Sequence, residues 1–413
     1  MNNMEKKQSS SAKRSAIKIS LMALISLLLL IPLAMVESLI EDREDSMETV
    51  AIEVANSYAE AQIVYAPELI STSVLKNGED KYYNCKKLDY KVSVDTDVLH
   101  RSIYDVIVYR SKIDISGNFK ITAAMINAKN NHFKLDITDF KGLASLPTLS
   151  FGGKTYNMAK SNNDLRTIVN LPEDVKIGDL VEFNITLDLK GTDALTFQPN
   201  AAETTLNISS TYPHPSFKGD ILPTHRDVRS DGFEATWSVL DMNINSAITD
   251  TMGVEFINPA NPYQQATRSA KYGILVIILV FVAGLLAELI SGKEISPIQY
   301  AIIGLSLVLF YSLLLSFSEF IAFGWAYVIA ALMTTTALTL YFKGILKSRN
   351  GYTLGGFVAL VYIVNYMLLQ METYALLAGS LVLFVLLCVV MYMTTTINTT
   401  KEQIKTESDS VQK

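Results

Sequence analysis

The stretch YGILVIILVFVAGLLAELI, residues 272–290, opens a run of apolar blocks that continues to residue 393. Short polar breaks divide the run into five blocks, at about 272–290, 297–317, 320–342, 352–369 and 373–393. A helix of about 20 apolar residues crosses the ~30 Å hydrocarbon core of a bilayer. Each block therefore predicts a transmembrane helix, and the chain is predicted to be a multi-pass membrane protein.

A sixth apolar block, 17–36, lies near the N-terminus and follows the basic residues Lys6, Lys7, Lys13 and Arg14. It is open to two interpretations, a cleaved signal peptide or a retained anchor. No small-residue cleavage site follows it, and it is longer than the apolar part of a usual signal peptide. We favour an uncleaved first transmembrane helix, preceded by a cytoplasmic lead at 1–16.

The basic residues of the short loops predict how the chain is threaded. Lys293 follows the second helix, and a basic cluster at 343–349 follows the fourth. The tail at 394–413 carries three lysines, whereas the loops around Glu319 and Glu372 carry no Lys or Arg. Because basic loops stay on the cytoplasmic side, both termini are predicted to be cytoplasmic. Residues 37–270 are then predicted to lie outside.

That outer region is predicted to start with a helix at 37–62, which continues the first membrane helix. Met47, Val50, Val54 and Tyr58 recur every three or four residues, while most acidic residues fall elsewhere on the helix. The acidic face is either a partner or cation site or a solvated surface. We favour the solvated surface.

From about residue 63 to 262 the apolar residues alternate with polar ones, most clearly in VEFNITLDLK at 181–190. Alternation of this kind is typical of half-buried antiparallel strands. Turn signals separate the strands at Gly117-Asn118, Gly142, Gly152-Gly153, Gly191 and Pro199-Asn200. We predict eight to twelve strands in an antiparallel, sandwich-like β domain. The whole chain is then a bundle of six transmembrane helices with this domain inserted between the first two.

Composition excludes some functions. A net charge of -6 over 413 residues argues against a nucleic-acid partner. The two cysteines, Cys85 and Cys388, fall in different regions, so no disulfide framework is expected. We also expect no cofactor.

The most distinctive polar segment is YPHPSFKGDILP at 212–223, followed by GFEATW at 232–237. Its prolines exclude a helix and favour a stiff, extended path. Glycines permit tight turns, and four large apolar residues offer anchors. The candidate residues are Pro213, His214, Pro215, Ser216, Phe217, Gly219, Asp220, Leu222, Pro223, Gly232, Phe233 and Trp237, with Phe217, Leu222, Phe233 and Trp237 as the anchors.

These two motifs resemble those of the inner-membrane CreD family, which shows PHPSFxGxxLP followed by GFxAxW. Further matches are Arg268, Lys271, Tyr272, Gln299, Tyr300 and Glu319, and the resemblance covers about 17–345. The chain departs from the family pattern at Tyr212, where Trp is commoner, at Lys141, where Arg is commoner, and at Ala66, where Gly is commoner. The resemblance implies a bacterial inner-membrane protein with a large periplasmic domain, connected with envelope maintenance and a stress or nutrient response. It implies no established catalytic activity.

The same segment allows two chemical hypotheses. His214, Ser216 and Asp220 are the residue types of a nucleophilic triad, but their close spacing in an extended segment makes convergence on one bond improbable. His214 and His225 with a carboxylate are potential zinc ligands at an unusual spacing. We favour a third interpretation, that the segment is a rigid cover joining the β domain to the membrane face.

Two acidic residues lie close to lipid, Glu288 and Glu319. Ionisable groups there are costly unless they are hydrated, paired or face a cavity. We expect hydration or a loop contact at the helix ends, and the alternative is a proton- or ligand-coupled site with Asn365 and Gln370. Small residues at Gly351, Gly355 and Ala359, and at Ala375 and Gly379, predict close approach of the fifth and sixth helices. The five helices show no inverted repeat and no broken mid-helix pair, which argues against a transporter.

The favoured function is non-enzymatic support of cell envelope integrity, with the outer domain contacting another envelope protein or a hydrophobic ligand. The alternative is a transporter or lipid-handling protein with a polar site among its helices. A membrane hydrolase is the third possibility. The expected partner in every case is the lipid bilayer, and the oligomeric state is left open.

Overall fold

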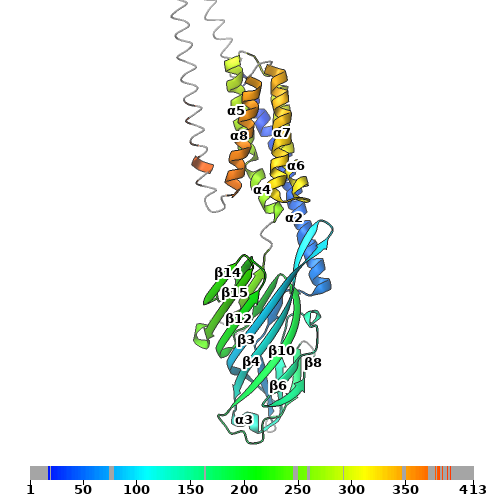
Figure 1. Ribbon diagram of the computed structural model, residues 1–413, viewed down its shortest axis with the longest axis vertical. Coiled ribbons are helices and arrows are strands. Elements are labelled where there is room, and N and C mark those ends of the chain that lie inside the picture. Colours follow the sequence, from blue (N-terminus) through cyan, green and yellow to red (C-terminus); the bar gives the residue numbers. More distant parts are fainter. Residues whose placement is uncertain are drawn as a thin grey trace, which may run out of the picture. The chain divides into compact units, whose positions relative to one another are not determined.

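The computed structural model describes residues 17–18, 20–73, 79–161, 164–244, 250–257, 261–291, 293–346 and 350–370, with single positions between 377 and 391. The chain splits into two compact units. The helical unit comprises Met1–Glu44 and Ala260–Lys413, and the β unit comprises Asp45–Pro259. Figure 1 labels the elements of both units.

The helical unit contains helices close to those predicted. They are the first part of α2 (Leu30–Tyr58), α4 (Pro262–Lys271), α5 (Gly273–Ser291), α6 (Pro297–Ser318), α7 (Phe323–Leu346) and α8 (Asn350–Gln370). In the part of the chain described, four helices are long and apolar enough to cross a membrane, or five if the bent pair α4 and α5 forms one span. The predicted helix at 373–393 lies largely outside the described residues.

One continuous helix runs Ser20–Tyr58, and the boundary between the two units falls within it. It ends four residues before the predicted end at residue 62. The last turn is closed by Lys141, whose Nζ donates to the carbonyl oxygen of Asn56 at 2.9 Å. A basic side chain on the last free carbonyls stabilises a helix C-terminus. Gln62 then starts a strand.

Helices α4 and α5 meet at a bend of 43°, which lies at the start of α5 and not in the middle of a predicted membrane helix. Asn261 caps α4 by accepting a hydrogen bond from the Tyr263 backbone nitrogen at 3.0 Å. Tyr272 is the C-cap residue of α4. Sequence reasoning missed α4 because its composition is too polar to resemble a membrane helix.

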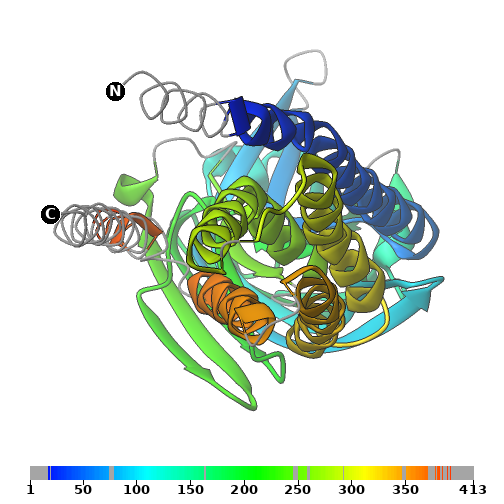
Figure 2. The same ribbon diagram turned by 90° about the horizontal axis from the view of Figure 1, so that it is seen from above.

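Helix α5 packs against α6 and α8, and α7 packs between α6 and α8, as the view along the bundle shows (Figure 2). A Cβ on Gly355 would lie 2.1 Å from Thr339 Oγ1, and one on Gly351 would lie 2.7 Å from the Lys343 backbone. These glycines therefore bring α8 against α7. The prediction that Gly351 and Gly355 serve a contact between the fifth and sixth helices is wrong, because they face the fourth.

The β unit holds sixteen strands in its described part, more than the eight to twelve predicted. They are β1 (Gln62–Val64), β2 (Glu68–Ser73), β3 (Asp80–Arg101), β4 (Tyr104–Lys120), β5 (Ala128–Leu135), β6 (Thr148–Phe151), β7 (Lys154–Asn157), β8 (Ala159–Ser161), β9 (Asp164–Val169), β10 (Leu180–Thr192), β11 (Ala194–Phe197), β12 (Ala201–Ser210), β13 (Pro215–Gly219), β14 (His225–Arg229), β15 (Gly232–Leu240) and β16 (Met252–Phe256). Three short helical turns accompany them, α3 (Ala123–Ile126), η1 (Phe140–Gly142) and η2 (Asp241–Asn243).

The strands form one sheet of twelve and one of four, the latter in the order β1-β11-β16-β13. Figure 1 shows β14, β15, β12, β3, β4, β10 and β6 in this order across the large sheet, which continues from β3 through β2 to β5, β9 and β8. The pairing is mainly antiparallel as predicted. Two pairs are parallel, β1 with β11 and β3 with β12, which alternation along single strands cannot reveal.

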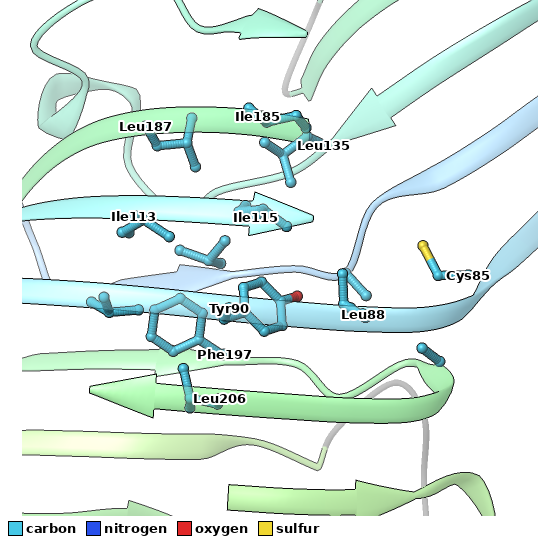
Figure 3. Close-up of a cluster of buried hydrophobic side chains, with 14 of the residues drawn as sticks. Cys85, Leu88, Tyr90, Ile113, Ile115, Leu135, Ile185, Leu187, Phe197 and Leu206 are labelled. Atoms are coloured by element: carbon cyan, nitrogen blue, oxygen red, sulfur yellow. The ribbon is translucent and has the colours of Figure 1, made fainter. Parts of the chain in front are cut away.

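Both sheets contribute side chains to one hydrophobic core, part of which Figure 3 shows. Tyr90 of β3 lies against Phe197 of β11, with ring centroids 5.0 Å apart. Burial alternates along β10 from Val181 to Leu189, which confirms the strand predicted from that pattern. Burying every second side chain of the long strands is what holds this unit together.

Two predicted turns are wrong. Gly117 lies inside β4 and Gly191 inside β10. A Cβ on Gly117 would lie 2.3 Å from the carbonyl oxygen of Lys87, and one on Gly191 would lie 2.4 Å from the Tyr109 hydroxyl. These glycines allow close packing within strands, whereas Gly152 and Gly153, with φ of 55° and 81°, do form a turn.

Candidate functional site

The segment at 213–223 forms an edge strand and its exit. Residues from Pro215 to Gly219 make up β13, which pairs antiparallel with β16. The ring of Phe217 packs edge-on against Phe233 and Trp237, with centroids 6.0 and 5.9 Å apart. The two family-like motifs therefore contact each other through their aromatic side chains.

Hydrogen bonds fix the path after β13. The indole nitrogen of Trp237, a fully buried side chain, donates to the carbonyl oxygen of Ile221 at 3.0 Å. The Asp220 carboxylate accepts from the Thr251 backbone nitrogen at 3.0 Å. Gly219 has φ of 111°, and a Cβ there would lie 2.3 Å from the Thr251 carbonyl oxygen. Glycine is thus the residue that this turn requires.

Gly232 has the same role at the start of β15. Its φ is 147°, and a Cβ would lie 2.2 Å from the carbonyl oxygen of Ser210. Leu222, by contrast, is 66% exposed, so its prediction as an apolar anchor is wrong. The chain turns there between β13 and β14, and the neighbouring Ile221 supplies the backbone contact to Trp237.

His214, Ser216 and Asp220 are not joined by any hydrogen bond within the described chain. The His214 ring lies edge-on to Tyr212, with centroids 6.1 Å apart. The Asp220 carboxylate is bound to backbone, and the exposed His225 starts the outer strand β14. Among the residues that the structure describes, no group of three His, Cys, Asp or Glu side chains is placed to hold a metal ion.

Charges beside β13 are paired. Lys218 Nζ donates to Glu255 Oε1 at 3.0 Å, and this hydrogen bond raises the pKa of Lys218. Burial raises the pKa of Tyr212, whose hydroxyl donates to the Ile257 carbonyl oxygen. Both shifts favour the protonated forms of Lys218 and Tyr212.

A groove that the sequence did not predict lies on the polar face of the large sheet. It has a volume of about 400 Å³ and is lined by residues of β3, β4, β12 and β15. A second hollow of about 250 Å³ adjoins it and shares Ser93, Ser209 and Glu234. Small side chains on the outer face of β12 create the hollow. We call the two together the β12 groove, lined by Lys91, Ser93, Asp95, Lys112, Asp114, Asn207, Ser209, Arg229, Asp231, Glu234 and Thr236 among others.

The register aligns polar side chains across the β12 groove. Lys91 lies between Asp114 on β4 and Asn207 on β12, and Asn207 lies opposite Thr236 on β15. Thr236 Oγ1 donates to Asn207 Oδ1 at 2.8 Å. Ammonium, carboxylate, amide and hydroxyl groups thus face one hollow, a set suited to hydrogen-bonding a polar ligand. The parallel pairing of β3 with β12 builds this row, and no sequence signal indicated it.

The motif residues of the helical unit mainly shape helix ends. Gln299 completes a capping box with Ser296 at the start of α6. The buried Tyr300 packs against Phe281 at 5.3 Å, and its hydroxyl donates to Glu288 at 3.5 Å. Arg268 and Lys271 lie in the last turn of α4, where positive charges interact favourably with the helix dipole and stabilise the helix.

The two acidic residues near lipid are both paired. Glu288 forms an ion pair with Lys18. Glu319 Oε1 lies 3.6 Å from Arg43 Nε. Asn365 instead hydrogen-bonds to Tyr327 and Ser269, so Glu319 and Asn365 belong to separate groups of contacts. The structure therefore does not assemble the predicted site of Glu319 with Asn365.

A buried polar group does exist among the helices. Asn365 of α8, Ser269 of α4, Tyr327 of α7, Tyr311 of α6 and Tyr362 of α8 are each at most 3% exposed. We call these five residues the Asn365 cluster. The sequence indicated Asn365, but not its partners, because tyrosines in membrane helices usually mark interfaces.

A family model described as "Inner membrane protein CreD" matches residues 14–400. The chain belongs to the CreD family. The inner membrane protein CreD of Escherichia coli (strain K12) is 29% identical over 409 residues, covering 90% of this chain and 91% of that protein. These matches confirm the resemblance read from the motifs, and they show an inner-membrane protein.

Two solved structures show a remote likeness to this CreD-family chain. An M1 zinc metallopeptidase from Deinococcus radiodurans bound to a Tyr-Ser-Ala substrate aligns with a TM-score of 0.25 and 9% identity, over 41% of this chain and 42% of that one. The same peptidase without that substrate gives a TM-score of 0.22 and 8% identity, over 41% of each chain. Likenesses this weak carry no inference about fold or chemistry.

Proposed function

We propose that this CreD-family protein supports the integrity of the cell envelope through non-catalytic recognition of a polar envelope component by its β unit. Membership of the CreD family supports the role in the cell envelope. The β12 groove is the observation that supports recognition by the β unit. The groove is open, carries charged and hydroxyl side chains along its length and is built from regular strands, so it is held in shape before any partner arrives.

The chemistry of the groove favours a polar partner over a hydrophobic one. Lys91, Lys112 and Arg229 face Asp114, Asp231 and Glu234 across a floor that includes Ser93 and Ser209. The buried apolar side chains of the β unit form its core. Another envelope protein or a glycan with hydrogen-bonding groups therefore fits better than a hydrophobic molecule.

The non-catalytic part of the proposal follows from the motif geometry. Asp220, Gly219 and Trp237 are committed to backbone contacts and turns, and His214 lies against Tyr212. A hydrolase needs a nucleophile beside a base and an oxyanion site. The contacts of this segment support a cover of the β unit instead.

The proposed arrangement in the cell follows from the basic loops. Six membrane helices, including the one at 373–393, leave both termini in the cytoplasm and the β unit in the periplasm. Both sheets contribute to one core, which supports a sandwich-like arrangement as part of the proposal. Protease added to cells with an opened outer membrane is expected to remove the β unit and spare the loops around Lys293 and Lys343.

Photo-crosslinking in intact cells tests the recognition. A crosslinking residue in place of Ser93 or Ser209 is expected to capture a discrete envelope component. The matched control is Asn184, an exposed residue of β10 that does not line the groove. Capture that is equal at all three positions would contradict a specific groove.

A groove-filling variant supplies the functional test. Ser209→Trp should weaken the envelope, measured as sensitivity to detergent, at unchanged protein abundance. Asn184→Trp should leave it intact. If cells carrying Ser209→Trp resist detergent as well as cells with the unaltered protein, the β12 groove has no part in the mechanism.

A further inference from the structure

The Asn365 cluster connects the consecutive helices α7 and α8 with α4, which is distant from them in sequence. Asn365 Nδ2 donates to the Tyr327 hydroxyl at 3.2 Å and to Ser269 Oγ at 3.5 Å. The Tyr327 hydroxyl donates to the Tyr362 carbonyl oxygen at 2.8 Å. These hydrogen bonds connect α4, α7 and α8 near the C-terminal end of α4, where the chain bends into α5.

Three polar atoms of the cluster have no hydrogen-bond partner among the described residues. They are Asn365 Oδ1, the Tyr311 hydroxyl and the Tyr362 hydroxyl. Leaving a buried polar atom unpaired costs about 1–3 kcal/mol. Most buried polar groups in proteins are paired, so three exceptions in one cluster require an explanation. Polar groups inside a membrane bundle usually mark a functional site.

The side chains that carry the three atoms lie in one neighbourhood. The ring of Phe310 lies 4.3 Å from that of Tyr362, 4.9 Å from that of Tyr311 and 5.3 Å from that of Tyr327, measured between centroids. Tyr362 and Asn365 are three residues apart on α8, and residues at that spacing share a helix face. The edge of the Tyr311 ring also reaches Gly273, at the start of α5.

The atoms define the ligand that would satisfy them. Each phenol hydroxyl can donate, and Asn365 Oδ1 can only accept. A metal cation would coordinate the oxygens and leave both phenol hydrogens unpaired. A carboxylate or phosphate would accept from the phenols and give nothing to Asn365. A neutral hydroxyl both accepts and donates, so it matches all three.

The position of the cluster favours a lipid headgroup as the source of the hydroxyl. Tyr327 lies four residues from the start of α7, and Asn365 lies five residues from the end of α8. At 1.5 Å per residue these are about 6 and 8 Å from helix ends. Discontinuous membrane helices such as α4 and α5 often border binding sites.

We propose that the Asn365 cluster binds a lipid through the free hydroxyl groups of its headgroup. The proposal goes beyond recognition by the β unit and does not depend on it. It gives the lipid-handling alternative a defined site, with Tyr311 and Tyr362 as donors and Asn365 as acceptor.

The test uses the full chain purified in detergent and presented with phosphatidylglycerol and phosphatidic acid of identical acyl chains. Only the former carries free hydroxyls on its headgroup. Native mass spectrometry is expected to show a preference for phosphatidylglycerol of about tenfold, corresponding to about 1.4 kcal/mol. Tyr362→Phe, Tyr311→Phe and Asn365→Leu should each reduce that preference.

Ser306→Ala is the control, because Ser306 Oγ on α6 already donates to the Ile302 carbonyl oxygen at 2.9 Å. It should keep the full preference. An equal affinity for both lipids, or a preference that survives all three cluster variants, would overturn the proposal. In that case Tyr362→Phe should raise the melting temperature, because it removes an unpaired hydroxyl from a dry core.

Free glycerol as competitor separates the two sources of hydroxyls. Retention of phosphatidylglycerol in the presence of a large excess of glycerol supports a lipid site. Displacement by glycerol, with no preference between the two lipids, would assign the cluster to a soluble polyol and refute the lipid.

Discussion

Glu44 and Asn261 hydrogen-bond to each other where the chain leaves the helical unit and where it returns. Asn261 Nδ2 lies 3.3 Å from Glu44 Oε1. Glu44 is the last residue of the first segment of the helical unit, and Asn261 follows the residue that begins the second. The same Asn261 side chain caps α4 through its oxygen. One amide thus links the two segments of the helical unit and caps α4.

Asn261→Ala should therefore destabilise the helical unit by more than a cap alone. Loss of an Asn cap costs about 0.5–2 kcal/mol. Asn261→Ser keeps a capping oxygen and loses the bond to Glu44, so it should cost less than Asn261→Ala. Thermal unfolding of the full chain in detergent measures both. Equal melting temperatures for the two variants would show that the cap contributes nothing.

The contact of α8 with α7 predicts opposite effects at adjacent glycines. Gly355→Ala places a Cβ within 2.8 Å of three atoms of Thr339, a stiff β-branched residue, and should cost about 1–3 kcal/mol. Gly356→Ala meets no atom within 4 Å and should be neutral or stabilise by up to about 1 kcal/mol. Unfolding in a denaturing detergent compares the two, and a similar loss at both sites would argue against tight helix contact.

Lys134 gives the β unit a defined dependence on pH. Its Nζ lies 2.7 Å from Asp136 and 3.5 Å from Glu68. Burial lowers the pKa of Lys134, but the hydrogen bond and charge of Asp136, with those of Glu68, outweigh it and the net shift is upward. The folded state therefore holds this proton more tightly than the unfolded chain. The stability so gained is complete below the ordinary pKa of 10.5 and is lost as pH rises above it.

Lys134→Met should cost roughly 1–3 kcal/mol near neutral pH, because it leaves two half-buried carboxylates beside each other. The cost should shrink as the pH falls towards 4, roughly the ordinary range of carboxyl groups, since protonation then removes their repulsion. Denaturant unfolding followed by Trp237 fluorescence, in a Trp325→Phe background, measures this. A cost that does not change between these pH values would contradict the ion-pair account.

Sequence patterns predicted local features well and long-range pairing poorly. Alternation from Val181 to Leu189 identified a strand because burial of one face acts on every second residue. The same pattern could not show that β12 runs parallel to β3, and the β12 groove depends on that pairing. Gly117 resembled a turn residue, although its lack of a side chain serves a close approach to Lys87. Asn365 was visible as a polar residue, and its partners on α4 and α7 were not.

The ion pair of Arg43 and Glu319 should respond asymmetrically to mutation. The Glu319 side chain is 10% exposed and that of Arg43 is 46% exposed. Arg43→Gln leaves a largely buried carboxylate without this partner, and should cost more than Glu319→Gln, which leaves a cation that water can reach. Melting temperatures of the two variants and of the double variant form the test. Equal losses would show that the pair is solvated like a surface ion pair.

Variants in the motif at 213–223 distinguish a packing role of this segment from a catalytic one. Gly219→Ala forces a side chain into a backbone with φ of 111° and towards the Thr251 carbonyl, so it should lower the amount of folded protein. Ser216→Ala and His214→Ala remove groups that hold no turn, and should leave both abundance and envelope protection unchanged. Quantitative blotting with a detergent-sensitivity assay reads the two effects separately. Loss of protection by Ser216→Ala at normal abundance would contradict the packing role and restore the hydrolase hypothesis.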